Sequence, residues 1–542
     1  MLTGLLSNLP PVVAADIDLN GITEKHVMIP MRDGKKLSAY LYFPKGKGPW
    51  PVLMEQRYAG LTATGTRKSF ASMAEEGYVI AAVNFRGTQL SQGKYVGYRA
   101  LGWGEKQDGY DVVEWLGVQT WSTGKIGTFG SSQAGYAQNF LAVTQPPHLV
   151  CQYMIDTGLS LYHEGYRIGG TTRPQRFKSM ERVCRNPEDA QALMRQWYQH
   201  PTYDDYWADE NCALHFDKMN VPCFTVGSWY DFMCVGSVNS YIGRQHQGGV
   251  KSQGNQQLLI GPWLHGRFNK TNKYRDVNYP DNAHFDMLPH MISYFDLHLK
   301  GIQPKTKNPT VQYYVMGAFD EPNAPGNIWK EANDWPIPTT PQAYYLQNSK
   351  TLSSSVPANE KGASHLKADP FLPAEIPGRS FPGAQDARPF EKQDNVLTFT
   401  TDRLEEAVEW TGNVTTELYV SSSAKDTDFI VRVSDVYPDG RSILIIDMIR
   451  RTRFRDGFEQ EKLLEPGKIS KVAFNVGWLS QIFNKGHRIR VTIASTGAPF
   501  YEPNPNTGKP LTIETPDEKV IAENTIYHNN KHASKVVAPV VK

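Results

Sequence analysis

The sequence has few cysteines, no long apolar run and almost no excess of charge. Its 542 residues include five cysteines without a Cys-x-x-Cys spacing, which excludes a disulfide scaffold and argues against a structural zinc site. One pair, such as Cys184 with Cys212, could still be bridged in an oxidising compartment. The net charge of +2 gives no reason to expect nucleic acid or an anionic membrane surface as a partner. No segment is long and apolar enough to span a bilayer.

Residues 1–15 form an apolar N-terminal segment. From Leu2 onward it reads LTGLLSNLPPVVAA and ends in small residues, like the end of a secretory signal before its cleavage site. The basic region that begins such a signal is missing, so a plain N-terminal arm stays an alternative. We favour export, to the periplasm or the medium, over a cytoplasmic location.

The length of the chain and the order of its apolar segments predict an α/β architecture. A chain this long exceeds one hydrophobic core, so two or three domains are expected. In residues 16–158 and 221–305, short apolar runs alternate with amphipathic stretches, the pattern of a parallel sheet covered by helices. The expected strands are 52–54, 78–85, 126–129, 149–155, 223–226 and 258–260.

Two further regions differ from this pattern. Residues 159–220 are polar, aromatic and helix-like, with the clearest helix at 188–199, and we expect them to form a helical cap inserted between strands. Residues 306–542 lose helical periodicity and contain short alternating or apolar runs separated by turn residues, which predicts an all-β jelly roll of the galactose-binding-like kind. Within that region, residues 352–385 are rich in Ser, Pro and Ala and are expected to form a long surface loop.

The most informative motif is a strand-to-helix junction, TFGSSQAGY, at residues 128–136. Small residues at Gly130 and Gly135 would allow a sharp turn that presents the Ser132 hydroxyl at the start of a helix, as in a nucleophile elbow. The N–H group of Gln133 would then face a developing oxyanion. The spacing is G-x-S-x-x-G instead of the common G-x-S-x-G, and a plain Gly/Ser turn is the alternative interpretation.

Two more side chains would complete a catalytic set with Ser132. Asp231 ends the motif GSWYD after one expected strand, and His265 ends GPWLH after the next. Open α/β sheets place their sites at these carboxyl ends, and the order Ser, Asp, His is that of α/β-hydrolases. We expect Ser132 to attack an acyl carbon, His265 to transfer the proton and Asp231 to orient the imidazole. For each residue alone, a helix cap at Asp231 or a turn contact at His265 is the alternative.

Further motifs extend along nearly the whole chain. They are VMIPMRDGKKL at 27–37, NFRG at 84–87, DGYD at 108–111, WSTGKIG at 121–127, FDLHLKG at 295–301, DTDF at 426–429, VYPDGR at 436–441 and GHRIR at 486–490. Together with the three motifs above, they resemble the cocaine esterase / X-Pro dipeptidyl-peptidase family of serine hydrolases, also called CocE/NonD. The G-x-S-x-x-G spacing resembles that family's own elbow. The resemblance implies an α/β-hydrolase domain, an inserted helical cap and a C-terminal jelly roll.

The resemblance also implies an oxyanion hole. The family uses a tyrosine hydroxyl after an early strand, and the matching segment PVLMEQRY ends at Tyr58, so Tyr58 takes that role beside the N–H group of Gln133. Many members carry an aromatic residue at the position of Gln133, and the pocket wall is expected to differ there. Trp229, Tyr230 and Trp263 are candidate pocket residues, with core packing beside the triad as the alternative.

The sequence therefore predicts a serine esterase that forms an acyl-enzyme on a small-molecule ester or amide, with no metal and no organic cofactor. An X-Pro dipeptidyl-peptidase, or an α-amino acid ester or amide hydrolase, is the first alternative. Asp204, Asp205, Asp209 and Glu210 could bind a substrate ammonium, although capping and solvation are favoured for them. A carbohydrate-binding protein with an inactive hydrolase half is the second alternative. Assembly into a homo-oligomer stays open.

Overall fold

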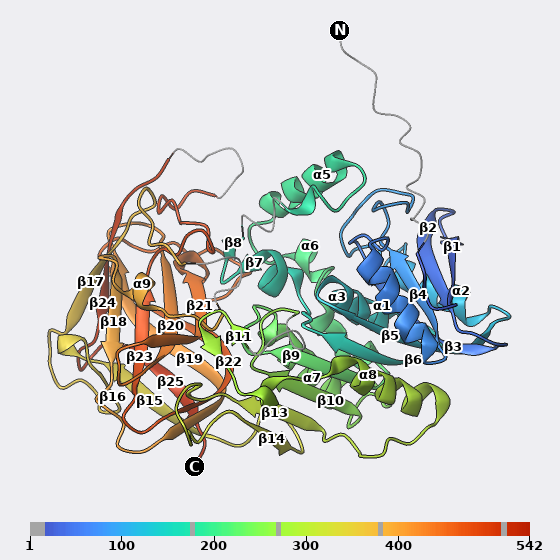
Figure 1. Cartoon of the computed structure of the whole chain (residues 1–542). Coiled ribbons are helices and arrows are strands. Elements are labelled where there is room, and N and C mark those ends of the chain that lie inside the picture. The colour runs from blue at the N-terminus through green and yellow to red at the C-terminus, as the bar shows by residue number, and fades with distance from the viewer. Residues whose placement is uncertain (1–16, 174–178, 267–272, 378–382, 511–517) are drawn as a thin grey trace, which may run out of the picture.

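The computed structural model describes residues 17–173, 179–266, 273–377, 383–510 and 518–542, and Figure 1 shows how they are arranged. The signal-like segment 1–15 lies outside the described residues. One ten-stranded sheet is built from the first part of the chain, and two antiparallel sheets are built from the C-terminal part.

The ten-stranded sheet is parallel in its centre and antiparallel at both edges. Its strands, in spatial order, are β1 (Thr23–Pro30), β2 (Lys36–Phe43), β4 (Val79–Asn84), β3 (Trp50–Arg57), β5 (Ser122–Ser131), β6 (Leu149–Ile155), β9 (Cys223–Ser228), β10 (Gln256–Gly261), β13 (Val311–Val315) and β14 (Ile328–Ala332). All residues of β4 and β9 are buried, as expected for strands with helices on both faces.

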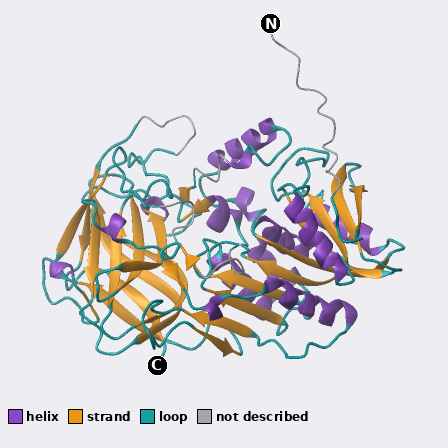
Figure 2. Cartoon of the chain, in the orientation of Figure 1, coloured by secondary structure: helices purple, strands orange, loops and turns teal. Residues whose placement is uncertain are grey.

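This order confirms the predicted α/β sheet. Figure 2 shows helices on both sides of it, and the principal ones are α1 (Thr64–Glu75), α2 (Asp108–Gly117), α3 (Gln133–Thr144), α7 (Cys234–Gln247) and α8 (Met287–Phe295). One expectation is corrected, because β13 and β14 lie beyond residue 305 yet pair with β10 and with each other in this first sheet. An apolar run such as VQYYV predicts a strand but contains no information about which sheet the strand joins.

The regular secondary structure between β6 and β9 is mostly helical, and its role as a cap stays a prediction. It contains η1 (Leu161–Tyr166), β7 (Arg167–Ile168), β8 (Thr171–Thr172), α5 (Pro187–Gln199), α6 (Asp205–Ala208) and η2 (Cys212–Lys218). Asn186 caps α5 by accepting the N–H of Glu188, with Pro187 at the first helical position. The β7–β8 turn packs against the C-terminal region, where the Gly169 carbonyl accepts the N–H of Arg451 at 2.9 Å.

The C-terminal region is a jelly roll of two antiparallel sheets. One contains β16 (Leu352–Ser353), β15 (Thr340–Leu346), β25 (Lys535–Val540), β19 (Val408–Ser422), β24 (Ala522–Tyr527) and β17 (Ala363–Ala368), with β22 (Ser470–Phe483) also paired to β19. The other contains β18 (Val396–Thr400), β23 (Arg488–Ala494), β20 (Asp428–Val436) and β21 (Ser442–Arg451). The strand β17 lies inside the Ser-, Pro- and Ala-rich stretch expected to be a loop.

Two general expectations can be compared with the described residues. All five cysteines are described and all are free thiols, so Cys184 and Cys212 are not bridged. Among the helices that the structure describes, none combines the length and hydropathy needed to cross a membrane.

Candidate active site

Ser132 lies at a strained turn between β5 and α3. Its backbone has φ 59° and ψ −112°, a conformation that costs a non-glycine residue of order 1–3 kcal/mol and marks functional turns. A Cβ atom at Gly130 would lie 2.5 Å from the Cβ of Ala134, and one at Gly135 would lie 2.9 Å from the Cβ of Thr157. The two glycines therefore let the helix approach the strand and hold the serine at the turn, as the motif predicts.

Asp231 and His265 are brought together beyond the ends of β9 and β10. The Nδ1 atom of His265 lies 2.7 Å from an Asp231 carboxylate oxygen, and the other oxygen of Asp231 accepts the N–H of Met233 at 3.0 Å. Asp231 is 6% exposed, so little water competes for its oxygens. The carboxylate can therefore fix the imidazole tautomer that has its proton on Nδ1.

The His265 turn is anchored on β6, the strand next to the one that presents Ser132. The N–H of Gly266 donates to the Asp156 carboxylate at 2.9 Å, and Asp156 is the first residue after β6. The preceding residue, Ile155, accepts the N–H of Ser132 at 3.0 Å. A short chain of contacts therefore links the nucleophile's backbone to the backbone of the base, although their strands are separated by β6 and β9.

Asp156 is a site residue that the sequence reasoning missed. It is fully buried, accepts the Ser228 hydroxyl at 2.8 Å and lies 3.9 Å from Nδ1 of His265. Burial is the largest cause that raises the pKa of Asp156, and the charge of Asp231 raises it further. Its position directly after the expected strand 149–155 is the signal that could have found it, since Asp231 and His265 were chosen by the same rule.

Tyr58 and Gln133 are in direct contact. The side-chain oxygen of Gln133 accepts the backbone N–H groups of both Tyr58 and Ala59 at 2.9 Å. Many hydrolases of this fold class take an oxyanion donor from the backbone of the loop after β3. Here the Gln133 side chain already accepts two of those N–H groups.

A cavity of about 550 Å³ adjoins the acid side of the site. It lies between the inserted segment, α7 and the jelly roll, and Asp231, Phe232, Ile168, Met448 and Phe500 are among its lining residues. The Phe232 ring is 5.6 Å, centroid to centroid, from the His265 ring. The cavity therefore extends from Asp231 toward the jelly roll and is mostly apolar, while Ser132 and His265 are not among its lining residues.

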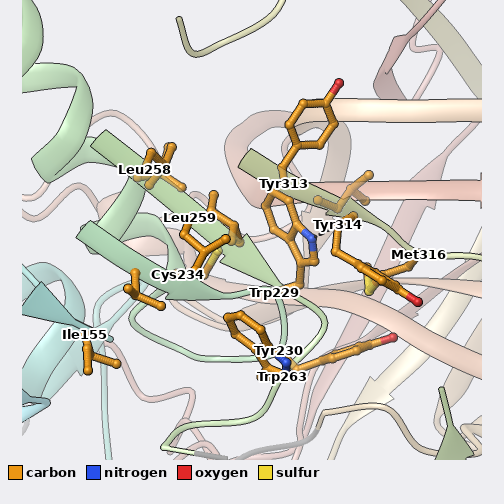
Figure 3. Close-up of a cluster of buried hydrophobic side chains, with 14 of the residues drawn as sticks. Ile155, Trp229, Tyr230, Cys234, Leu258, Leu259, Trp263, Tyr313, Tyr314 and Met316 are labelled. Carbon is orange, nitrogen blue, oxygen red and sulfur yellow. Dashed lines mark hydrogen bonds between the residues drawn. The ribbon is translucent and has the colours of Figure 1, made fainter. Parts of the chain in front are cut away.

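The three candidate pocket residues belong to one buried aromatic cluster, shown in Figure 3. Trp229 and Tyr230 line the cavity, and each also makes a core hydrogen bond, Trp229 to the Tyr314 carbonyl and Tyr230 to the Tyr279 hydroxyl. Trp263 is not among the cavity residues and donates to the Ala283 carbonyl at 2.7 Å.

The four acidic residues considered for binding a substrate ammonium, Asp204, Asp205, Asp209 and Glu210, do not line this cavity. Asp204 lies 2.6 Å from the His200 ring, and Glu210 is buried and pairs with Arg99 at 3.3 Å. Burial raises the pKa of Glu210 to about 7. The carboxyl groups that do line it, besides Asp231, are Glu164 and Asp447.

Asp156, Asp231 and His265 are also the group with the spacing of a metal site among the described residues, because one ligand atom from each lies within 4.8 Å of the others. Each of these atoms already has a protein partner. The Asp231 oxygen is bonded to Nδ1, and the Asp156 oxygen is bonded to Gly266 N–H. The arrangement therefore fits a proton relay as it stands.

Comparisons with known proteins cover both halves of the chain. The family model described as X-Pro dipeptidyl-peptidase (S15 family) matches residues 33–267, and the model for the X-Pro dipeptidyl-peptidase C-terminal non-catalytic domain matches residues 304–537. Cocaine esterase from Rhodococcus sp. (strain MB1 Bresler) is 29% identical over 594 aligned residues, which cover 97% of this chain and 100% of the esterase.

Two solved structures have the same fold over almost the full length. An α-amino acid ester hydrolase has a TM-score of 0.86 at 22% identity, covering 98% of this chain and 99% of the other. An aminopeptidase from a marine sediment archaeon, Thaumarchaeota archaeon, has a TM-score of 0.84 at 22% identity, covering 99% of each chain. Both likenesses extend through the jelly roll, so the whole arrangement of parts is shared.

Proposed function

The chain belongs to the cocaine esterase / X-Pro dipeptidyl-peptidase (CocE/NonD) family of serine hydrolases, and on that basis we propose that it hydrolyses carboxylic esters through an acyl-enzyme on Ser132. His265 takes the proton of the Ser132 hydroxyl and returns it to the leaving group, while Asp231 holds Nδ1–H and stabilises the imidazolium. Water, activated by the same imidazole, then releases the acid.

The observation that carries this proposal is the 2.7 Å contact between Asp231 and His265 beside a strained Ser132 turn. Triad roles depend on such geometry more than on sequence position. The Gly266–Asp156 contact supports the same conclusion, because it holds the base over the strand adjacent to the nucleophile.

We assign the oxyanion hole to the Gln133 N–H and the Tyr58 hydroxyl. Gln133 is the first residue of α3, where backbone N–H groups point out of the helix and favour developing negative charge. Its side chain also holds the loop of Tyr58 through two hydrogen bonds. One residue would thus supply one donor and position the other.

The cavity favours an ester with a bulky apolar group. Its walls include Phe232, Met448, Phe500 and Ile168, and burial of such a group contributes roughly 25 cal/mol per Å² of apolar surface. A volume of about 550 Å³ falls in the range of small-molecule sites.

A peptidase or amino acid ester hydrolase is the second candidate. Two carboxyl groups, Glu164 and Asp447, line the cavity and could meet a substrate ammonium. Glu164 already accepts the N–H groups of Leu159 and Ser160, and burial raises its pKa to about 7. Its remaining capacity for a cation is therefore smaller than that of an unbonded carboxylate, which favours the ester.

The expectation of export rests only on the N-terminal segment.

The test is a comparison of wild type with Ser132→Ala. Wild type should react with a fluorophosphonate probe and hydrolyse p-nitrophenyl esters of aromatic or branched acids, whereas Ser132→Ala should do neither. An X-Pro p-nitroanilide measured in parallel distinguishes the peptidase. Probe labelling of Ser132→Ala, or a wild type that labels nowhere, would contradict the proposal.

A further inference from the structure

Asp156 has a constrained backbone and a buried side chain. Its residue has φ 45°, its N–H donates to the Val226 carbonyl at 2.9 Å, and its side chain is fully buried. Positive φ is tolerated by Asp, Asn and Gly and disfavoured elsewhere. A buried acid in such a conformation costs stability, and residues of this kind cluster at functional sites.

Two carboxylates approach the same nitrogen of His265. Asp231 lies 2.7 Å and Asp156 lies 3.9 Å from Nδ1. Asp156 comes from the end of β6, while Asp231 comes from the loop after β9, the neighbouring strand. The imidazole therefore has an acid from each of two adjacent strand ends on its Nδ1 side.

A purely structural role does not require this charge. Asp156 accepts hydrogen bonds from the Ser228 hydroxyl and the Gly266 N–H. A neutral amide could keep both contacts, because its oxygen can accept the Gly266 N–H while its NH₂ group donates to the Ser228 hydroxyl oxygen. A second buried carboxylate beside Asp231 instead adds like-charge repulsion. That repulsion is relieved at one moment, when His265 becomes an imidazolium between them.

We propose that Asp156 is a second acid of the catalytic relay, which positions the His265 turn and stabilises the imidazolium together with Asp231. This inference rests on the proposed function, because it assigns His265 as the base. Asp156 acts through His265 and touches no substrate, so it is a positioning residue.

The groups that face Asp156 give the direction of its pH dependence. Burial and Asp231 raise the pKa of Asp156, while His265 acts in the opposite direction. The Cys234 thiol also faces both aspartates, and burial is the main cause that raises its pKa. Asp156 therefore keeps its proton to a higher pH than an ordinary carboxyl group does, and its support of the imidazolium increases as that proton is lost.

The first experiment uses Asp156→Asn and Asp156→Gly, both of which suit a positive φ. Each is expected to lower kcat about 10- to 100-fold with KM within about twofold. The acid limb of the kcat/KM profile should move to lower pH, because the imidazolium forms less readily without the second carboxylate. Titration of active sites with the fluorophosphonate probe normalises kcat to folded enzyme, so a loss of folded protein cannot produce this result.

The second experiment removes the other acid. Asp231→Asn should retain more activity than loss of a sole triad acid, which costs about 10⁴-fold. This activity should rise with pH as Asp156 ionises, at a lower pH than in wild type because the charge of Asp231 no longer raises the pKa of Asp156. Asp156→Asn/Asp231→Asn should fall at least about tenfold further and lose that rise.

Two results would overturn the inference: a normal pH profile and kcat in Asp156→Asn, or an Asp231→Asn variant as inactive as the double variant at all pH values. Loss of wild-type activity in EDTA with recovery in Zn²⁺ would also overturn it, because the three side chains would then be metal ligands. Ser132→Ala separates the two proposals. If it is active, the proposed function fails; if it is inactive while Asp156→Asn is normal, only the role of Asp156 fails.

Discussion

Two histidines of this chain, one at the sheet edge and one in the jelly roll, each have two acids nearby, and the positions of those acids around the ring differ. His265 has Asp231 and Asp156 on its Nδ1 side, at 2.7 and 3.9 Å. His487 has Asp435 on Nδ1 and Glu321 on Nε2, both at 2.8 Å. The jelly-roll histidine is therefore bonded through both nitrogens to carboxylates. Neither acid of the first pair occupies Nε2 of His265.

The difference separates a structural histidine from one that can transfer a proton. An imidazole hydrogen-bonded to carboxylates through both nitrogens is favoured in its charged form, because both nitrogens can donate only when both are protonated. An imidazole with its acids on one side can change charge at the other nitrogen while its orientation is kept. Buried acid near histidine is thus common to both regions, and the side of the ring that it occupies decides the role.

The largest expected effect comes from exchanging each histidine for alanine. His265→Ala should lower kcat by a factor on the order of 10⁴ or more with little change in thermal stability. His487→Ala should keep kcat within about twofold and lower the free energy of unfolding by roughly 3 kcal/mol, because it leaves two carboxylates without their cation. The measurements are kcat for ester hydrolysis and the thermal unfolding of both variants. Equal losses of kcat in the two variants would contradict the assignment of His265 as catalytic and His487 as structural.

The sequence predicted the positions of these groups unevenly. Ser132, Asp231 and His265 each follow a short apolar run, and those runs became β5, β9 and β10. Asp156 follows β6 in the same way, but it lies in no motif of its own, and its contact with Gly266 spans 110 residues. Contacts of that kind depend on strand order, which local patterns do not contain.

Other differences have equally local causes. The strand β17, ASHLKA, exposes Ser, His and Lys in part and lies at a sheet edge, so its composition resembles a loop. Trp263 has the same sequence setting as Trp229, yet only Trp229 lines the cavity. Both indole groups donate to a backbone carbonyl, so tertiary packing, which the local sequence does not contain, decides which of the two faces the cavity.

A smaller loss of kcat is expected from replacing Gln133, a neutral residue of the active site, than from replacing His265. Gln133→Leu removes the acceptor for Tyr58 and Ala59 N–H and should lower kcat about tenfold, since a misplaced oxyanion donor loses part of its contribution. Gln133→Glu retains acceptor oxygens for the two N–H groups but adds negative charge beside the developing oxyanion, so its kcat should also stay below that of wild type.

The matched control is Gln481, which is buried in the jelly roll and donates to the Ile482 carbonyl at 2.9 Å, with Asp435 at 3.4 Å. Gln481→Leu should cost roughly 1–2 kcal/mol of stability and leave kcat unchanged. Steady-state kinetics on both leucine variants would contradict the comparison if the jelly-roll variant lost more turnover than Gln133→Leu.

The smallest expected effect is a pH dependence of stability that arises from His487. Burial alone would lower the pKa of His487, but the hydrogen bonds and charges of Asp435 and Glu321 outweigh burial and raise it. A raised pKa means that the folded protein holds the proton more tightly than the unfolded chain does, so the stabilisation is fully present below about pH 6.5 and is lost as pH rises through the raised value. The melting temperature of wild type should therefore fall by about 2–4 °C as pH rises through the raised pKa of His487. His487→Gln should melt lower at pH 6 and lack this fall, whereas a variant that keeps the full fall would assign the pH dependence to another group.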